Sequence, residues 1–66
     1  MTLKEMREAA GLRQEDVAKK LNVDQAAVSN WERGKTGISR KYHKKLAKLY
    51  RRTVDELLNA DKEAQT

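Results

Sequence analysis

The sequence contains no cysteine and a single histidine. The lack of thiols excludes a disulfide framework and a thiolate metal site, and one imidazole does not provide the ligand set of a zinc site. We therefore expect no bound metal and no other cofactor. Paired carboxylates, a nucleophile–histidine arrangement and a phosphate-binding glycine loop are also missing from the sequence. These absences argue against an enzyme.

Proline is absent too, and no segment alternates apolar and polar residues with the period of a β-strand. No apolar run approaches the roughly 20 residues needed to cross a bilayer, and no signal-peptide pattern opens the chain. We therefore expect a cytoplasmic protein with no membrane partner. Its 66 residues have room for one domain, whose core supplies only about 3–5 kcal/mol of net stability.

Basic residues are abundant and unevenly distributed. The net charge is +5, and charged residues make up 38% of the sequence, the same share as hydrophobic residues. Residues 33–52 contain nine Lys or Arg and no acid, which leaves six basic and ten acidic residues elsewhere. This asymmetry favours a polyanion bound on one side of the molecule, and the alternative is a basic helix face that is merely solvated.

Hydrophobic spacing predicts five short helices, with the second over residues 14–21 and the third over residues 25–33. Thr2 with Glu5, and Thr53 with Glu56, have capping-box spacing at the starts of the first and fifth helices. The other expected caps and stops are Gly11, Asn22, Asp24, Gly34 and Ser39. We expect residues 1–60 to form the domain and residues 61–66 to be a polar, frayed tail.

The third expected helix has two unlike faces. At 100° per residue, one arc of about 140° contains Gln25, Ala26, Ser29, Asn30 and Arg33. Ala27, Val28 and Trp31 fall on the opposite side. One face can therefore pack on a core while the other presents amides, a hydroxyl and a guanidinium. These groups match the hydrogen-bonding edges of bases and phosphates, which indicates a helix that enters a DNA groove.

A resemblance to a known family extends over residues 2–60. The sequence resembles helix-turn-helix proteins of the Cro/phage-repressor type, also called xenobiotic-response-element regulators. The residues that carry the resemblance are Gly11-Leu12, Gln14, Val17-Ala18, Leu21, Val23, Gln25, Val28-Ser29, Trp31-Glu32, Gly34-Lys35, Leu46-Ala47, Leu49-Tyr50 and Asp55-Glu56-Leu57-Leu58. It implies an all-α, five-helix, lambda-repressor-like domain whose helix-turn-helix is formed by the second and third helices.

The resemblance also implies roles for individual residues in binding double-stranded DNA. The expected base-reading residues are Gln25, Ala26, Ser29 and Asn30. The expected phosphate-binding residues are Arg13, Gln14, Arg33, Lys35 and Arg40. Gln14 is further expected to support the first side chain of the recognition helix. For Lys44, Lys45 and Lys48, solvation is the better expectation.

Two charged residues resemble a structural pair of the family: Arg7 in the first helix and Glu32 at the end of the third. Three positions depart from the family pattern. Arg13 replaces a small capping residue, and Arg51-Arg52 replaces a common Gly-Val. Because a left-handed Arg51 would cost roughly 1 kcal/mol, we expect the fourth helix to run longer or to end irregularly. Arg52 removes an expected core contact, which leaves the docking of the fifth helix open.

The leading hypothesis is a sequence-specific transcriptional regulator, a repressor that binds a near-palindromic operator as a homodimer, with dimerisation on DNA as one route. Half-sites in such operators lie about one helical turn apart. A second hypothesis is an antitoxin that binds a toxin protein and represses its own operon. A restriction-modification controller or another activator is a third.

Overall fold

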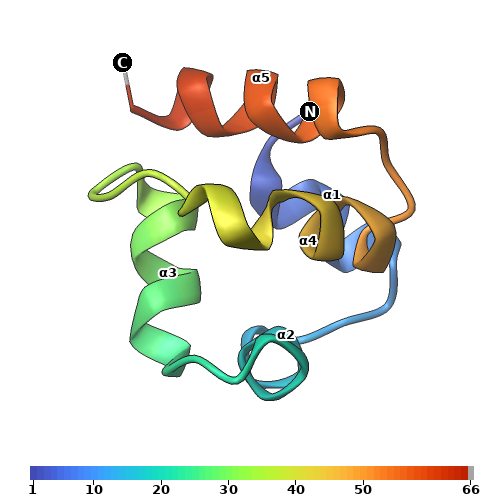
Figure 1. The fold of residues 1–66 in the computed structure, drawn as a ribbon, viewed down its shortest axis with the longest axis vertical. Helices are drawn as coiled ribbons and strands as arrows, with labels where there is room; N and C mark the ends of the chain where they lie inside the picture. The colour runs from blue at the N-terminus through green and yellow to red at the C-terminus, as the bar shows by residue number, and fades with distance from the viewer. Residues whose placement is uncertain (66) are drawn as a thin grey trace.

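The computed structural model describes residues 1–65, which form five α-helices, one 3₁₀ turn and no strand. The elements are α1 (Leu3–Ala9), α2 (Gln14–Leu21), α3 (Gln25–Arg33), η1 (Arg40–Tyr42), α4 (His43–Leu49) and α5 (Val54–Ala64). In Figure 1, α2 and α5 lie at opposite ends of the molecule, with α4 and α1 between them and α3 along one side. The predicted all-α, five-helix architecture is confirmed.

Local signals explain most helix ends. Thr2 and Thr53 each form a complete capping box with the glutamate three residues later. Asn22 ends α2 in the left-handed conformation, with φ 58°, and Gly34 ends α3 with φ 73°. Both residue types tolerate this conformation better than others do, so the chain reverses sharply at these points.

The core lies where the five helices meet, and its most deeply buried side chains are Val17, Val28, Leu46 and Leu57. Trp31 is 5% exposed, and its ring lies 5.7 Å from that of Tyr42. α5 packs on the core through Leu57 and Ala60. Within residues 1–65, no helix is long and apolar enough to cross a membrane.

Several details differ from the sequence-based expectations. Asp24 and Ser39 occupy cap positions without making a side-chain cap hydrogen bond. Ser39 precedes the 3₁₀ turn η1 and not α4, which begins only at His43. α5 continues past residue 60 to Ala64, and Asp61 is buried, so residues 61–64 are helix and not a frayed tail. Thr66, the last tail residue, lies outside the described residues.

The junction between α4 and α5 corrects another expectation. α4 does not run longer, because it ends at Leu49 and Arg51 adopts the left-handed conformation with φ 57°. Arg52 lies partly exposed and pairs with Glu56, with 3.4 Å between its Nη1 and Glu56 Oε2. The long, charged Arg52 side chain thus reaches the surface, and α5 docks on the core without it.

Candidate nucleic-acid interface

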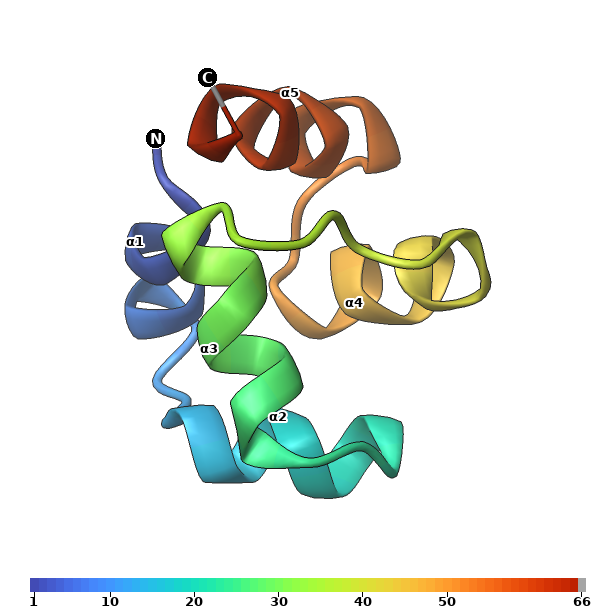
Figure 2. The ribbon, with the colours of Figure 1, turned by 90° about the vertical axis from the view of Figure 1, so that its left-hand side faces the viewer.

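α2 and α3 form a helix-turn-helix through the turn at residues 22–24. Asn22 reverses the chain, and the N–H of Val23 donates to the carbonyl of Ala18 over 2.9 Å. Val23 packs partly buried against the core and holds the turn in place. Figure 2 shows α3 crossing the near face of the molecule above α2. A helix presented in this way can enter the major groove of B-DNA.

α3 divides its side chains as the helical geometry predicts. Val28 is fully buried and Trp31 nearly so, while Gln25 and Ala26 are exposed and Ser29 and Asn30 are partly exposed. Buried side chains fix the helix on the core, and the outer side offers two amides, one hydroxyl and one methyl group. Amides can pair with adenine, and a methyl group can contact thymine, so the outer side has the chemistry for base contacts.

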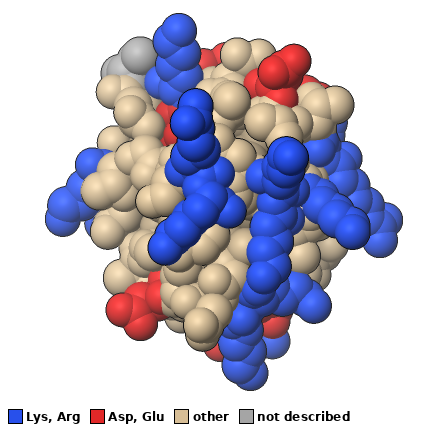
Figure 3. Space-filling view, in the orientation of Figure 1, with Lys and Arg blue, Asp and Glu red and all other residues tan. Residues whose placement is uncertain are grey.

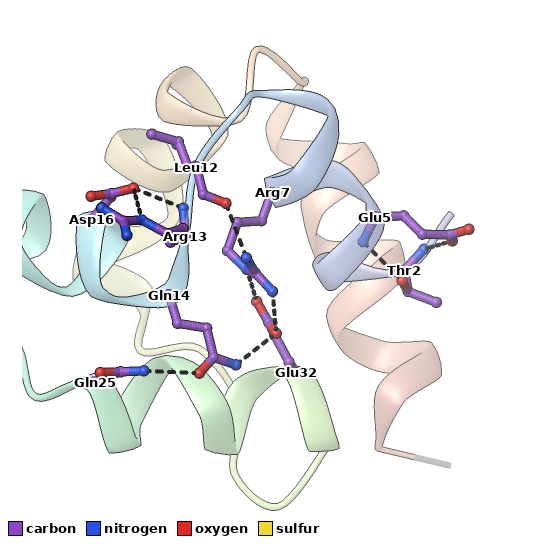
Figure 4. A network of polar contacts seen from close by, with 9 residues as sticks. All are labelled: Thr2, Glu5, Arg7, Leu12, Arg13, Gln14, Asp16, Gln25 and Glu32. Carbon is purple, nitrogen blue, oxygen red and sulfur yellow. Dashed lines mark hydrogen bonds and ion pairs between the residues drawn. The ribbon is translucent and has the colours of Figure 1, made fainter.

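A chain of polar contacts links Arg7 of α1 to Gln25 at the start of α3 (Figure 4). Arg7 Nε donates to Glu32 Oε2 over 2.6 Å, and Arg7 Nη2 donates to Glu32 Oε1 over 3.2 Å. Gln14 Nε2 donates to the same Glu32 Oε1 over 2.9 Å, and Gln14 Oε1 accepts from Gln25 Nε2 over 3.3 Å. Gln25 is therefore the exposed end of a network anchored in the interior.

The inner end of this network is an ion pair removed from solvent. The side chains of Arg7 and Glu32 are only 9% and 7% exposed. Arg7 Nη1 also donates to the carbonyl of Leu12 over 3.0 Å, which ties the ion pair to the α1–α2 connection. The hydrogen bond to Glu32 raises the pKa of Arg7. A buried ion pair with this many hydrogen bonds fixes the relative positions of α1, α2 and α3.

A second contact on α3 was missed by the sequence analysis. Asn30 Oδ1 accepts a hydrogen bond from Arg33 Nη2 over 2.7 Å, and the bond lies on the exposed surface. The i, i+3 spacing of the two residues was the signal that could have predicted it. An amide oxygen can accept two hydrogen bonds, so Asn30 can still contact a base through this oxygen or through its amide nitrogen.

Basic side chains lie at the end of α3, in the segment after it and at the start of α2. Arg33, Lys35 and Arg40 are exposed at the end of α3 and in the segment that follows it. Arg13, at the start of α2, is 77% exposed, but it pairs with Glu15 over 3.1 Å and with Asp16 over 3.6 Å. Arg13 thus already shares its charge with two acids.

The lysines of α4 are a further group of exposed cations. Lys44, Lys45 and Lys48 are exposed, and Figure 3 shows Lys and Arg side chains across the face on which α4 lies. Lys45 and Lys48, together with Lys20 and Leu49, line an open hollow of about 580 Å³. Its lining has cations but no side chain suited to chemistry on a small substrate. No group of three or more metal-binding side chains occurs among the described residues.

The comparisons with known proteins agree with this geometry. Residues 3–57 match the helix-turn-helix family. The HTH-type transcriptional activator BcrR of Enterococcus faecalis is 36% identical over 59 residues, which cover 89% of this chain. These residues make up 29% of that relative, so the chain spans less than a third of its length. No solved structure matches the chain. The chain belongs to the Cro/phage-repressor type of helix-turn-helix proteins, the xenobiotic-response-element family.

Proposed function

We propose that the chain regulates transcription by binding a specific duplex DNA sequence, with α3 in the major groove. The observation that carries the proposal is the position of Gln25. Its amide is exposed on the outer face of α3 and is held by Gln14, which is held in turn by the buried Glu32. A side chain ordered before binding loses less rotamer freedom on contacting a base, and an amide is suited to adenine.

The basic residues around α3 supply the second part of the proposal. In this arrangement Arg33, Lys35 and Arg40 contact phosphates on one side of α3, and Arg13 and the start of α2 contact them on the other. Phosphate contacts position the protein on the duplex, and base contacts by Gln25 and its neighbours select the sequence. Ala26, Ser29 and Asn30 complete the base-reading set.

On this proposal the protein acts as a repressor and binds a near-palindromic operator as a two-fold dimer. Two copies related in this way place their α3 helices in major grooves about one helical turn apart. Occupation of a promoter by such a dimer would exclude RNA polymerase. The second candidate function is activation, which the name of the Enterococcus faecalis relative favours.

Selection of bound sites from randomised duplexes tests the proposal. We expect a half-site repeated in inverted orientation, with centres about 10–10.5 base pairs apart. Recovery of unrelated sequences would contradict specific recognition, and recovery of single half-sites would contradict the dimer. A reporter gene with the selected site placed over the promoter, or upstream of it, then separates repression from activation.

Two substitutions distinguish base contacts from phosphate contacts. Gln25→Ala should weaken binding to the selected site by roughly 1–3 kcal/mol and relax the preference at one base pair. Lys35→Ala should weaken binding to all duplexes and lower the salt slope of the binding constant by about 1. Lys4→Ala removes the same charge from the exposed surface of α1 and serves as the control. Equal losses for Gln25→Ala on specific and random DNA would remove Gln25 from the base-reading set.

A further inference from the structure

The segment between α3 and η1, residues 34–39, connects the cations proposed to contact phosphates. Lys35 lies within this connecting segment, Arg33 directly precedes it and Arg40 directly follows it. Its first part is fixed by the end of α3, because the N–H of Lys35 donates to the carbonyl of Asn30 over 2.9 Å. The contacts that hold the remainder of the segment therefore set the distance between Lys35 and Arg40.

Ile38 is the anchored residue of the connecting segment. Its N–H donates to Asp61 Oδ2 over 3.2 Å, and its carbonyl lies 2.9 Å from Nε2 of His43. Its side chain is part of the core and is 6% exposed. Both backbone polar groups of one buried loop residue thus bond to side chains of two different helices, α5 and α4. Such bonds satisfy buried groups that would otherwise be costly.

The connecting segment also contacts the last turn of α5 at its two glycines, Gly34 and Gly37. A Cβ at Gly34 would lie 1.8 Å from the carbonyl oxygen of Ala64, and a Cβ at Gly37 would lie 2.7 Å from Nε2 of Gln65. Gln65 Nε2 donates to Asp61 Oδ1 over 3.3 Å, so the second oxygen of Asp61 is held as well. The backbone of the segment therefore lies directly against the end of α5.

Asp61 is negatively charged and buried, so it is not suited to contact DNA directly. Asp61 is only 8% exposed, and a carboxylate beside phosphate-binding cations repels the phosphates they would bind. Its oxygens are used to accept hydrogen bonds from Ile38 and Gln65. Asp61 therefore holds the segment through an acceptor oxygen that is fixed in place on α5.

We propose that the last turn of α5, together with His43, positions the connecting segment so that Lys35 and Arg40 meet the DNA backbone together. Asp61 and His43 are positioning residues that act through Ile38, and neither contacts DNA. The inference rests on the proposed function, because it assigns the end of α5 to the phosphate-binding side of that interface. Loss of the anchor should weaken phosphate contacts and leave base selection by Gln25 intact.

A charge-matched pair of variants tests the inference. Asp61→Asn and Asp61→Leu both remove one negative charge, but only asparagine retains an oxygen that can accept from Ile38. The first measurement is amide hydrogen exchange of the DNA-free protein. In Asp61→Leu we expect the Ile38 N–H to exchange roughly tenfold faster than in Asp61→Asn, with the amides of α2 and α3 unchanged. Equal exchange of Ile38 in the two variants would overturn the anchor.

The second measurement is the salt dependence of duplex binding by the same two variants. Asp61→Leu should bind with a salt slope lower by about 1–2 than that of Asp61→Asn, which corresponds to one or two lost phosphate contacts. Its preference among base pairs should not change. Equal slopes, with the exchange difference present, would show an anchor without a positioning role and would overturn the proposal.

Failure of the proposed function gives a different result from failure of this inference. If the unaltered chain bound no duplex, the proposed function and the positioning role would both be overturned, whereas the exchange difference would still report the anchor. Should Asp61→Leu not fold, His43→Leu and His43→Gln form the replacement pair, because glutamine can still donate to the carbonyl of Ile38. His43→Leu should then show the lower salt slope, and equal slopes would again overturn the proposal.

Discussion

The side-chain amides of Gln14 and Gln25 are joined by a hydrogen bond of 3.3 Å between Gln25 Nε2 and Gln14 Oε1. The two residues begin α2 and α3, the two helices of the helix-turn-helix. Gln14 is itself fixed by Glu32, whose carboxylate is paired with Arg7. The orientation of an exposed amide on α3 thus depends on a buried ion pair at the other end of the same network.

Gln14→Ala should reduce discrimination at the base pair contacted by Gln25, because it removes the group that orients the Gln25 amide. A double-mutant cycle with Gln25→Ala on the selected DNA site measures the dependence. We expect a coupling energy of at least about 0.5 kcal/mol, as for residues within one hydrogen-bond network. Additive losses would mean that Gln25 does not need Gln14.

Arg7→Met should destabilise the fold by about 3–5 kcal/mol, because it leaves the Glu32 carboxylate buried without its cation. This loss is as large as the whole stability expected for a core of this size, so the variant should be largely unfolded at 25 °C. The double variant Arg7→Met with Glu32→Leu removes both charges and should recover much of the loss in urea unfolding. No recovery would show that packing, and not the unpaired charge, causes the damage.

Gly34→Ala should destabilise the protein more than Gly11→Ala, and the two substitutions form a matched pair. Both glycines have a positive φ, 74° at Gly11 and 73° at Gly34. A Cβ at Gly11 meets nothing within 4 Å, whereas one at Gly34 meets the carbonyl of Ala64. Gly11→Ala should therefore cost only the roughly 1 kcal/mol of the backbone conformation, and Gly34→Ala should also displace the end of α5. Equal midpoints in urea unfolding would contradict the close approach.

Acid should weaken the fold through its helix caps. Backbone N–H groups of Thr2 and Thr53 lower the pKa of Glu5 and Glu56 below the ordinary value of 4.5, and the backbone N–H of Arg13 lowers that of Asp16. A lowered pKa in the folded state means that ionised caps stabilise it above the ordinary pKa. This stabilisation is lost as pH falls through the lowered pKa.

Thermal unfolding between about pH 5 and about pH 3 measures this effect. The midpoint of the unaltered chain should fall over this range. Glu5→Gln with Glu56→Gln retains side-chain oxygens that can accept the cap hydrogen bonds but cannot titrate. The double variant should be slightly less stable at pH 7 and should show a shallower decline. Parallel curves for the two proteins would assign the acid sensitivity to other groups.

The helices could be predicted because their ends depend on residues close in sequence. Thr2 and Thr53 cap helices through the glutamates three positions on, and Asn22 and Gly34 end helices by their own backbone preferences. The family resemblance is likewise carried by residues with fixed spacing, and it is confirmed. The left-handed Arg51 could not be foreseen from preference alone, because residues other than glycine, asparagine and aspartate disfavour this conformation.

Contacts between distant residues were harder to predict. Asp61 stands in a polar end of the sequence that resembles a solvated tail, and its burial depends on where α5 docks. Its bond to Ile38 spans 23 residues, and no local spacing indicates such a partner. The pairing of Asn30 with Arg33 was within reach of helical spacing, but both were considered only as DNA contacts. The assignments of base and phosphate contacts stay predictions.

Arg33 is the only cation of α3, and Glu32, the only acid of that helix, is paired with Arg7. The other cations proposed to contact phosphates, Arg13, Lys35 and Arg40, lie outside α3. On the proposed docking, general attraction to nucleic acid and the choice of target are therefore encoded in different stretches of the gene. A few codon changes at positions 25, 26, 29 and 30 can redirect such a protein to a new promoter during evolution, while its capacity to find and hold DNA is inherited unchanged.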